Sequence, residues 1–193
     1  MRKRRVVICA CVVLAAAAVA VASGMRMFKG LLTGFQEVPA ISTAAGGEFN
    51  IEIGEDENSL SYQVTYSNLE ADATQSHIHF GQPGVAGGIS VWLCSNLASP
   101  PTPAGTQACP LRSGTITGTI TAANVIGPAG QGIAPGEFAE LVRAMRAGQT
   151  YVNVHSTKFP TGEIRGQIDA GNKRGKLKGR GDDGDDDHDH GQH

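Results

Sequence analysis

The middle of the chain alternates apolar and polar residues with a period of two, which is the pattern of half-buried β-strands. Apolar side chains occupy every second position of residues 49–53 and again of residues 60–66. The turn-forming sequence Gly54-Glu-Asp-Glu-Asn58 separates the two runs. Two such strands joined by a turn predict a β-hairpin.

Six further short segments have the composition of strands and are bounded by glycine, proline and small polar residues. They are residues 29–33, 75–80, 89–93, 114–121, 151–156 and 162–168. Together with the hairpin they predict an all-β domain of about eight strands. Short strands separated by glycine, proline and small polar residues are typical of a Greek-key β-sandwich or barrel.

One segment departs from the period of two. Phe138, Leu141, Val142 and Met145 are spaced as on one face of a helix, and Gly148 follows as a candidate C-terminal cap. We therefore expect one short helix within residues 136–147, packed over the edge of the sandwich.

Residues 1–23 have the layout of a secretory signal peptide. Residues 2–5 are basic, residues 6–21 are almost entirely apolar, and Ala20-Val-Ala22 offers a small-residue cleavage site. An uncleaved membrane anchor is the alternative, because the apolar run approaches the minimum spanning length. The alanine content and the cleavage triplet favour removal. We expect a secreted, periplasmic or cell-surface protein that is not in the membrane after cleavage.

The last 24 residues, 170–193, contain too few apolar side chains to form a core, and we expect them to be disordered. Residues 173–180 are basic and glycine-rich, whereas residues 182–193 are rich in aspartate and histidine. This run either captures metal loosely or is simply solvated. One domain over residues 28–169 remains. It has no basic patch with interleaved aromatic residues, so nucleic acid is not an expected partner.

Two cysteines remain after the signal segment, Cys94 and Cys109. An even pair in an exported protein predicts a disulfide. On the chain-entropy model, closing a loop of this size stabilises the fold by roughly 3 kcal/mol.

The predicted domain contains three histidines, His77, His79 and His155. His77 and His79 are two apart on a strand, so both imidazoles point to the same face. If the strand of His155 neighbours or faces theirs, three imidazoles converge and can hold a metal ion with an open position. Imidazole suits copper and zinc. The alternative is that these histidines are ordinary hydrogen-bonding residues.

A second polar cluster follows His155. Pro160-Thr-Gly162 predicts a turn, after which Glu163, Arg165 and Gln167 share one face of a returning strand. A polar outer face accounts for Glu163 and Gln167. Arg165 has a functional interpretation: its guanidinium, close to the metal, would attract a small anion.

Three blocks of the sequence resemble the signature of the CHRD domain, which is named for chordin and is common in exported microbial proteins. They are Leu32-Thr-Gly-Phe-Gln-Glu-Val-Pro39, Ser76-His-Ile-His-Phe-Gly81, and Tyr151-Val-Asn-Val-His155 continuing through Gly162-Glu-Ile-Arg-Gly-Gln-Ile168. The resemblance covers roughly residues 28–169.

The same residues are similar, more faintly, to the copper-ligand motifs of copper/zinc superoxide dismutases, which are Greek-key sandwiches with a disulfide. The resemblance implies copper at His77, His79 and His155, with zinc the less expected occupant, and Arg165 as an anion-guiding residue acting on superoxide. The chain departs from that family in lacking the bridging histidine and the histidines of the zinc subsite.

Two hypotheses result. In the first, an exported CHRD-domain protein binds one copper ion and has superoxide dismutase-like activity or carries copper without turnover. In the second, it is a non-enzymatic extracellular binding module in which the histidines are structural.

Overall fold

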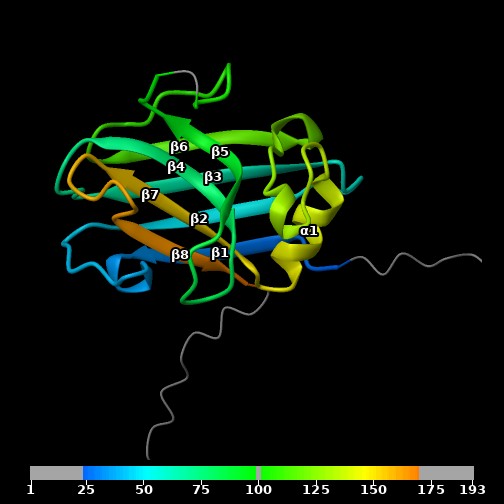
Figure 1. Ribbon diagram of the computed structural model, residues 1–193, viewed down its shortest axis with the longest axis horizontal. Coiled ribbons are helices and arrows are strands. Elements are labelled where there is room, and N and C mark those ends of the chain that lie inside the picture. The colour runs from blue at the N-terminus through cyan, green and yellow to red at the C-terminus, as the bar shows by residue number, and fades with distance from the viewer. Residues whose placement is uncertain (1–23, 99–100, 170–193) are drawn as a thin grey trace, which may run out of the picture.

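The computed structural model describes residues 24–98 and 101–169, which form eight antiparallel strands in a nearly closed barrel with one α-helix (Figure 1). The predicted all-β class and each of the eight predicted strands are confirmed. The strands are β1 (Met27–Thr33), β2 (Gly46–Ile53), β3 (Ser59–Ser67), β4 (Ala73–Phe80), β5 (Gly88–Ser95), β6 (Gly114–Thr121), β7 (Thr150–Ser156) and β8 (Ile164–Ile168).

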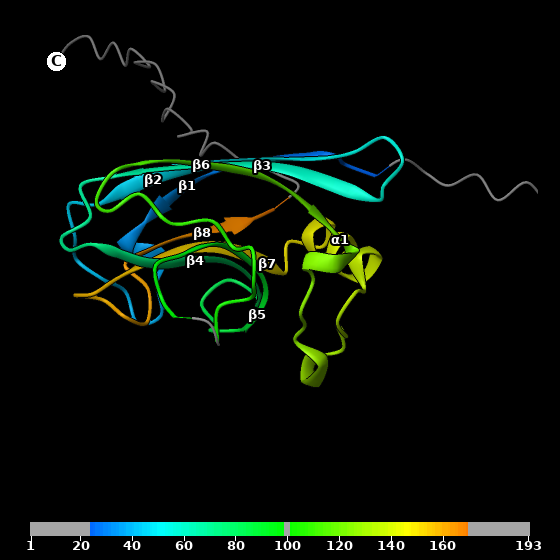
Figure 2. The ribbon, with the colours of Figure 1, turned by 90° about the horizontal axis from the view of Figure 1, so that it is seen from above.

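The strands lie in two layers, which Figure 2 shows from above. The hydrogen-bonded order is β5-β4-β7-β8-β1-β2-β3-β6, so β5, β4, β7 and β8 form one layer and the other four strands form the second. A single residue pair, Thr33 with Arg165, joins the layers along β1 and β8. The chain passes from one layer to the other three times, between β3 and β4, between β5 and β6 and between β6 and β7, which is a Greek-key arrangement.

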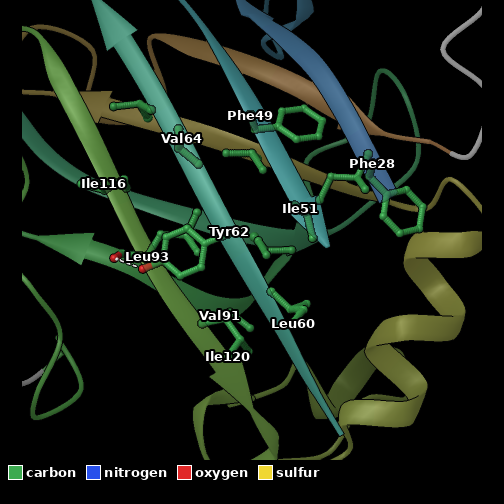
Figure 3. Packing of buried hydrophobic residues seen from close by; sticks show 14 of the residues in the cluster. Phe28, Phe49, Ile51, Leu60, Tyr62, Val64, Val91, Leu93, Ile116 and Ile120 are labelled. Carbon is green, nitrogen blue, oxygen red and sulfur yellow. Dashed lines mark hydrogen bonds between the residues drawn. The ribbon is translucent and has the colours of Figure 1, made fainter. Parts of the chain in front are cut away.

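The apolar residues of the alternating pattern fill the space between the layers (Figure 3). Phe49 and Val64 come from one layer and Val91 from the other, and all are at most 1% exposed. The hydroxyl of Tyr62 crosses the core and donates to the carbonyl of Leu93 at 2.9 Å. Because β-strand side chains alternate, this leaves every second position of β4, β7 and β8 on the outer face of their layer.

The one α-helix among the described residues, α1 (Phe138–Arg146), lies at one end of the two layers (Figures 1 and 2). Phe138, Leu141 and Met145 are buried on its apolar face, as the helical spacing predicts. Arg146, in the last turn, forms an ion pair with Glu57 in the β2–β3 turn at 2.7 Å. The helix therefore closes one end of the core.

Cys94 at the end of β5 forms a disulfide with Cys109, which confirms the predicted pairing. The side chain of Asn96 donates to the carbonyls of Ala73 and Cys109, and its oxygen accepts from the amide of Cys109. The disulfide and the side-chain amide of Asn96 together hold the segment after β5 against the start of β4.

The predicted signal segment, residues 1–23, and the predicted tail, residues 170–193, lie outside the described residues. Within residues 24–98 and 101–169, no helix has the length and apolar character needed to cross a bilayer.

Candidate metal site

The three histidines meet on the outer face of the β4–β7 pair. β4 and β7 are hydrogen-bonded neighbours, with His77 opposite Asn153 and Gln75 opposite His155. His155 is therefore diagonal to His77 on the same face. One ligand atom from each of His77, His79 and His155 lies within 4.8 Å of the others. The prediction that the three imidazoles converge is confirmed.

Backbone carbonyls orient two of these imidazoles. Nδ1 of His79 donates to the carbonyl of Gly87 and Nδ1 of His155 donates to that of Pro160, each at 2.9 Å. A ring nitrogen that donates to a carbonyl carries the proton, so Nε2 of each ring keeps a free lone pair. Such outer hydrogen bonds are typical of metal-binding histidines.

Two of the ring nitrogens have no hydrogen-bond partner. Nε2 of His77 and Nε2 of His79 are buried and have no hydrogen-bond partner. Nδ1 of His77 lies 3.3 Å from Nε2 of His155. Leaving a buried polar atom unpaired costs about 1–3 kcal/mol. A metal ion that accepts these lone pairs would remove that cost, so the residues present fit a metal.

Burial keeps all three imidazoles neutral. His77, His79 and His155 are 0%, 7% and 6% exposed. Burial lowers the pKa of His77 to about 2, helped by the neighbouring His155 and His79, and lowers that of His79 to about 4, partly opposed by its hydrogen bond to Gly87. Burial also lowers the pKa of His155, against the effect of its bond to Pro160. Neutral imidazole is the form that binds metal.

Two aromatic rings support the histidines. The indole of Trp92 on β5 packs edge-on against His77, with the ring centroids 4.3 Å apart. The phenol of Tyr151 on β7 is stacked on His79 at 4.7 Å, with the ring planes 1° from parallel. These contacts limit how far either imidazole can rotate.

Arg165 lies next to this stack and is only 2% exposed. The carbon at the centre of its guanidinium is 3.4 Å from the ring centroid of Tyr151. Its terminal nitrogens donate to the carbonyls of Val85 and Gln82 at 3.0 Å and to the side chain of Gln167 at 3.2 Å. Arg165 thus lies near the histidines, and two of these three hydrogen bonds are to the loop between β4 and β5.

A comparison with models of known protein families gives a match. The model of the CHRD domain matches residues 28–168, which is most of the chain. This chain belongs to the CHRD domain family. Comparison with curated proteins and with solved structures gives no match.

One expectation for this CHRD domain is wrong. Glu163 was expected on a solvated outer face, but it is 0% exposed. Its Oε1 accepts from the hydroxyl of Thr43 and from the amide of Glu70, each at 2.9 Å. The reason is that loops from distant parts of the chain cover the outer face of β7 and β8, which the alternation along a single strand does not reveal.

Three polar residues of the CHRD domain's site were not singled out from the sequence. Asn153 and Tyr151 alternate with His155 along β7, and this spacing was the signal that could have found them. Glu37 gives no periodic signal, because it lies in a loop. Its carboxylate fills the space beside Gly162, where a Cβ atom would lie 2.4 Å from Oε1. Burial raises the pKa of Glu37 to about 7, although the positive charge of Arg165 opposes the shift.

Proposed function

We propose that this CHRD-domain protein binds a single copper ion through His77, His79 and His155. The observation that carries the proposal is the convergence of three buried, neutral imidazoles, two of which have an Nε2 atom with no other partner. A purely structural role for the histidines would leave these two buried Nε2 atoms without a partner.

The donor set favours copper over other ions. All three ligands are imidazoles, and no carboxylate or thiolate belongs to the cluster. Calcium and magnesium prefer oxygen donors. Imidazole suits both copper and zinc, and copper is bound more tightly than zinc by a given set of nitrogen donors. Zinc is therefore the competing occupant in our proposal.

We further propose superoxide dismutase-like chemistry at this site. Copper, when bound, supplies one-electron redox chemistry, by which one superoxide is oxidised to dioxygen and a second is reduced to hydrogen peroxide with two protons. The chain contributes the positive charge of Arg165, which attracts a small anion such as superoxide. It also excludes water from the histidines, which are at most 7% exposed.

A copper carrier without turnover is the second candidate. The same burial of the three histidines favours it, because a covered metal offers a substrate little access. In either role we propose that the protein is exported, cleaved from its signal segment and not attached to a membrane. The disulfide between Cys94 and Cys109 is compatible with an oxidising compartment.

The single tryptophan of the chain provides a local reporter of binding. Trp92 contacts His77, so Cu²⁺ at the site should quench its fluorescence, whereas Zn²⁺ should bind without strong quenching. We expect quenching to be complete at one equivalent of Cu²⁺. His79→Ala should abolish tight binding and the quenching that accompanies it.

Copper binding by the histidines of the C-terminal segment must be distinguished from binding at the proposed site in this test. A variant with His188, His190 and His193 replaced by alanine should show the same one-equivalent quenching as the parent protein. Unchanged copper affinity and quenching in His79→Ala would reject the proposed site.

Superoxide decay distinguishes the two roles. The copper-loaded protein, with the same three tail histidines replaced, should consume many equivalents of superoxide if it is an enzyme. A carrier should consume no more than about one equivalent for each bound ion. Loss of turnover in His79→Ala would assign the activity to this site.

A further inference from the structure

The segment between β4 and β5, residues 81–87, lies over the histidine site, and we refer to it as the covering loop. Its centre is the turn Gln82-Pro-Gly-Val85, closed by a hydrogen bond from the amide of Val85 to the carbonyl of Gln82 at 3.1 Å. Proline at the second position and a glycine with a φ of 75° at the third are typical of a type II turn. The loop is thus a defined structure that can be held or released as a unit.

Arg165 holds both ends of this turn. One terminal nitrogen donates to the carbonyl of Val85 and the other to that of Gln82, each at 3.0 Å. Gln167 adds a hydrogen bond from its amide nitrogen to the carbonyl of Gly81 at 2.9 Å. Two side chains of β8 therefore anchor the covering loop at three carbonyl groups.

The far end of the covering loop is tied to His79 through Gly87. The carbonyl of Gly87 accepts from Nδ1 of His79, and its amide donates to the hydroxyl of Tyr151 at 3.2 Å. Tyr151 is in turn stacked between His79 and the guanidinium of Arg165, because β7 lies between β4 and β8. Arg165 and His79 are linked both through the Tyr151 ring and through the loop backbone.

We propose that Arg165 is a positioning residue that fastens the covering loop over His79 and thereby sets how fast a metal ion enters and leaves the site. The part of this inference that concerns metal rests on the proposed function. The part that concerns the loop does not, since it is a property of the metal-free protein.

The shape of the Arg165 side chain is as important for holding the covering loop as its charge. A guanidinium presents a rigid fork of donors that can reach two carbonyls at once and can stack flat on an aromatic ring, whereas an ammonium is a point charge. Lysine at this position would keep the positive charge and lose the fork. Arg165→Lys therefore separates fastening of the loop from attraction of an anion, which needs the charge alone.

The first experiment measures amide hydrogen exchange in the full-length, metal-free protein. In Arg165→Lys the amides of Val85 and Gly87 should exchange at least about tenfold faster than in the parent protein, while amides in the β2–β3 hairpin keep their rates. Arg143→Lys, on the exposed side of α1, is the matched control and should change neither set. Unchanged exchange at Val85 and Gly87 in Arg165→Lys would overturn the inference.

The second experiment measures the rate at which copper leaves the loaded protein to a strong chelator, in a background that lacks His188, His190 and His193. Loss of outer support for a ligand typically weakens metal binding by about 10–100-fold, and we expect dissociation from Arg165→Lys to be faster by a factor in that range. An equal rate in the two proteins would refute control of exchange by Arg165. If the parent protein binds no copper, the proposed function fails, and amide exchange still decides the role of the loop.

Tyr151→Phe provides a second test that does not alter Arg165. It keeps the stacked ring and removes only the hydroxyl that accepts from the amide of Gly87. We expect faster exchange at Gly87 and a changed NMR signal of the Nδ1 proton of His79, with little effect at Val85. A purely structural role for Tyr151 in the core would leave the His79 signal unchanged.

Discussion

Acidification should destabilise the metal-free protein through its buried histidines. The pKa of His79 falls from 6.5 to about 4 on folding, and that of His77 falls to about 2. A lowered folded-state pKa means that the unfolded chain takes up the proton first. The stabilising effect of neutral His77 and His79 is thus present above pH 6.5 and is lost progressively as the pH falls toward those two values.

The size of this effect follows from proton linkage. Each group that is protonated only in the unfolded state costs about 1.4 kcal/mol of stability per pH unit below its unfolded pKa. When the pH falls from about 7 to about 5, His77 and His79 should each lower the free energy of unfolding by about 2 kcal/mol, or by about 4 kcal/mol together. The lowered pKa of His155 acts in the same direction.

Glu37 opposes this loss. Its pKa is raised from 4.5 to about 7 on folding, so the folded protein takes up the proton over the same range of pH. The stability from protonated Glu37 is fully present below pH 4.5 and is lost as the pH rises through about 7. When the pH is lowered from about 7 to about 5, protonation of Glu37 should therefore raise the free energy of unfolding by about 2 kcal/mol. Because His155 adds to the loss, we expect a net loss of at least about 2 kcal/mol in the parent protein.

Urea unfolding at several pH values, in the presence of a chelator, measures the balance. Glu37→Gln should remove the opposing contribution, so the loss of stability between about pH 7 and about pH 5 should grow by about 2 kcal/mol relative to the parent protein. His79→Gln should reduce the loss by about 2 kcal/mol relative to the parent. The reasoning is refuted if Glu37→Gln has the same pH profile as the parent protein, or if His79→Gln does not flatten it.

Three further changes test the fold around the site. Replacing Cys94 and Cys109 by serine should lower the free energy of unfolding by about 3 kcal/mol, and an unchanged urea midpoint would contradict this. Gly162→Ala should cost about 1–3 kcal/mol in thermal unfolding, because a Cβ atom would lie 2.4 Å from Oε1 of Glu37 at a φ of 129°. Leu141→Ala, on the buried face of α1, should cost about 2–5 kcal/mol by urea unfolding, and a loss below about 1 kcal/mol would mean that the helix does not close the core.

The sequence was sufficient for the strands because alternation is a local signal. In β2 and β3 the apolar residues face the core and the polar residues face outward, so the period of two was read correctly. The same local signal placed His77 and His79 on one face. His155 lies beside them because β4 pairs with β7, which is about 70 residues or more away in the sequence. No local pattern specifies this pairing.

The sequence was misleading where the outer face of a strand is also buried. Every residue of β7 is buried, although its sequence reads as a half-exposed strand. The outer face is covered by the loop that carries Glu37, by the covering loop of residues 81–87 and by the turn at Pro160. The burial of Glu163 and Arg165 could not be read from β8 itself, because it depends on where these loops lie in three dimensions.

This arrangement separates the two properties that a metal site needs. The spacing of the histidines is set by the ladder between β4 and β7, whose inner face carries apolar side chains such as Ile78 and Val154 and is packed into the core. Access to the histidines is set by the covering loop, which is held mainly by hydrogen bonds from β8. A change in the loop or its anchors should therefore alter the rate of metal exchange while leaving the positions of the three imidazoles intact. A change in the core beneath them should move the imidazoles themselves and lower affinity at equilibrium.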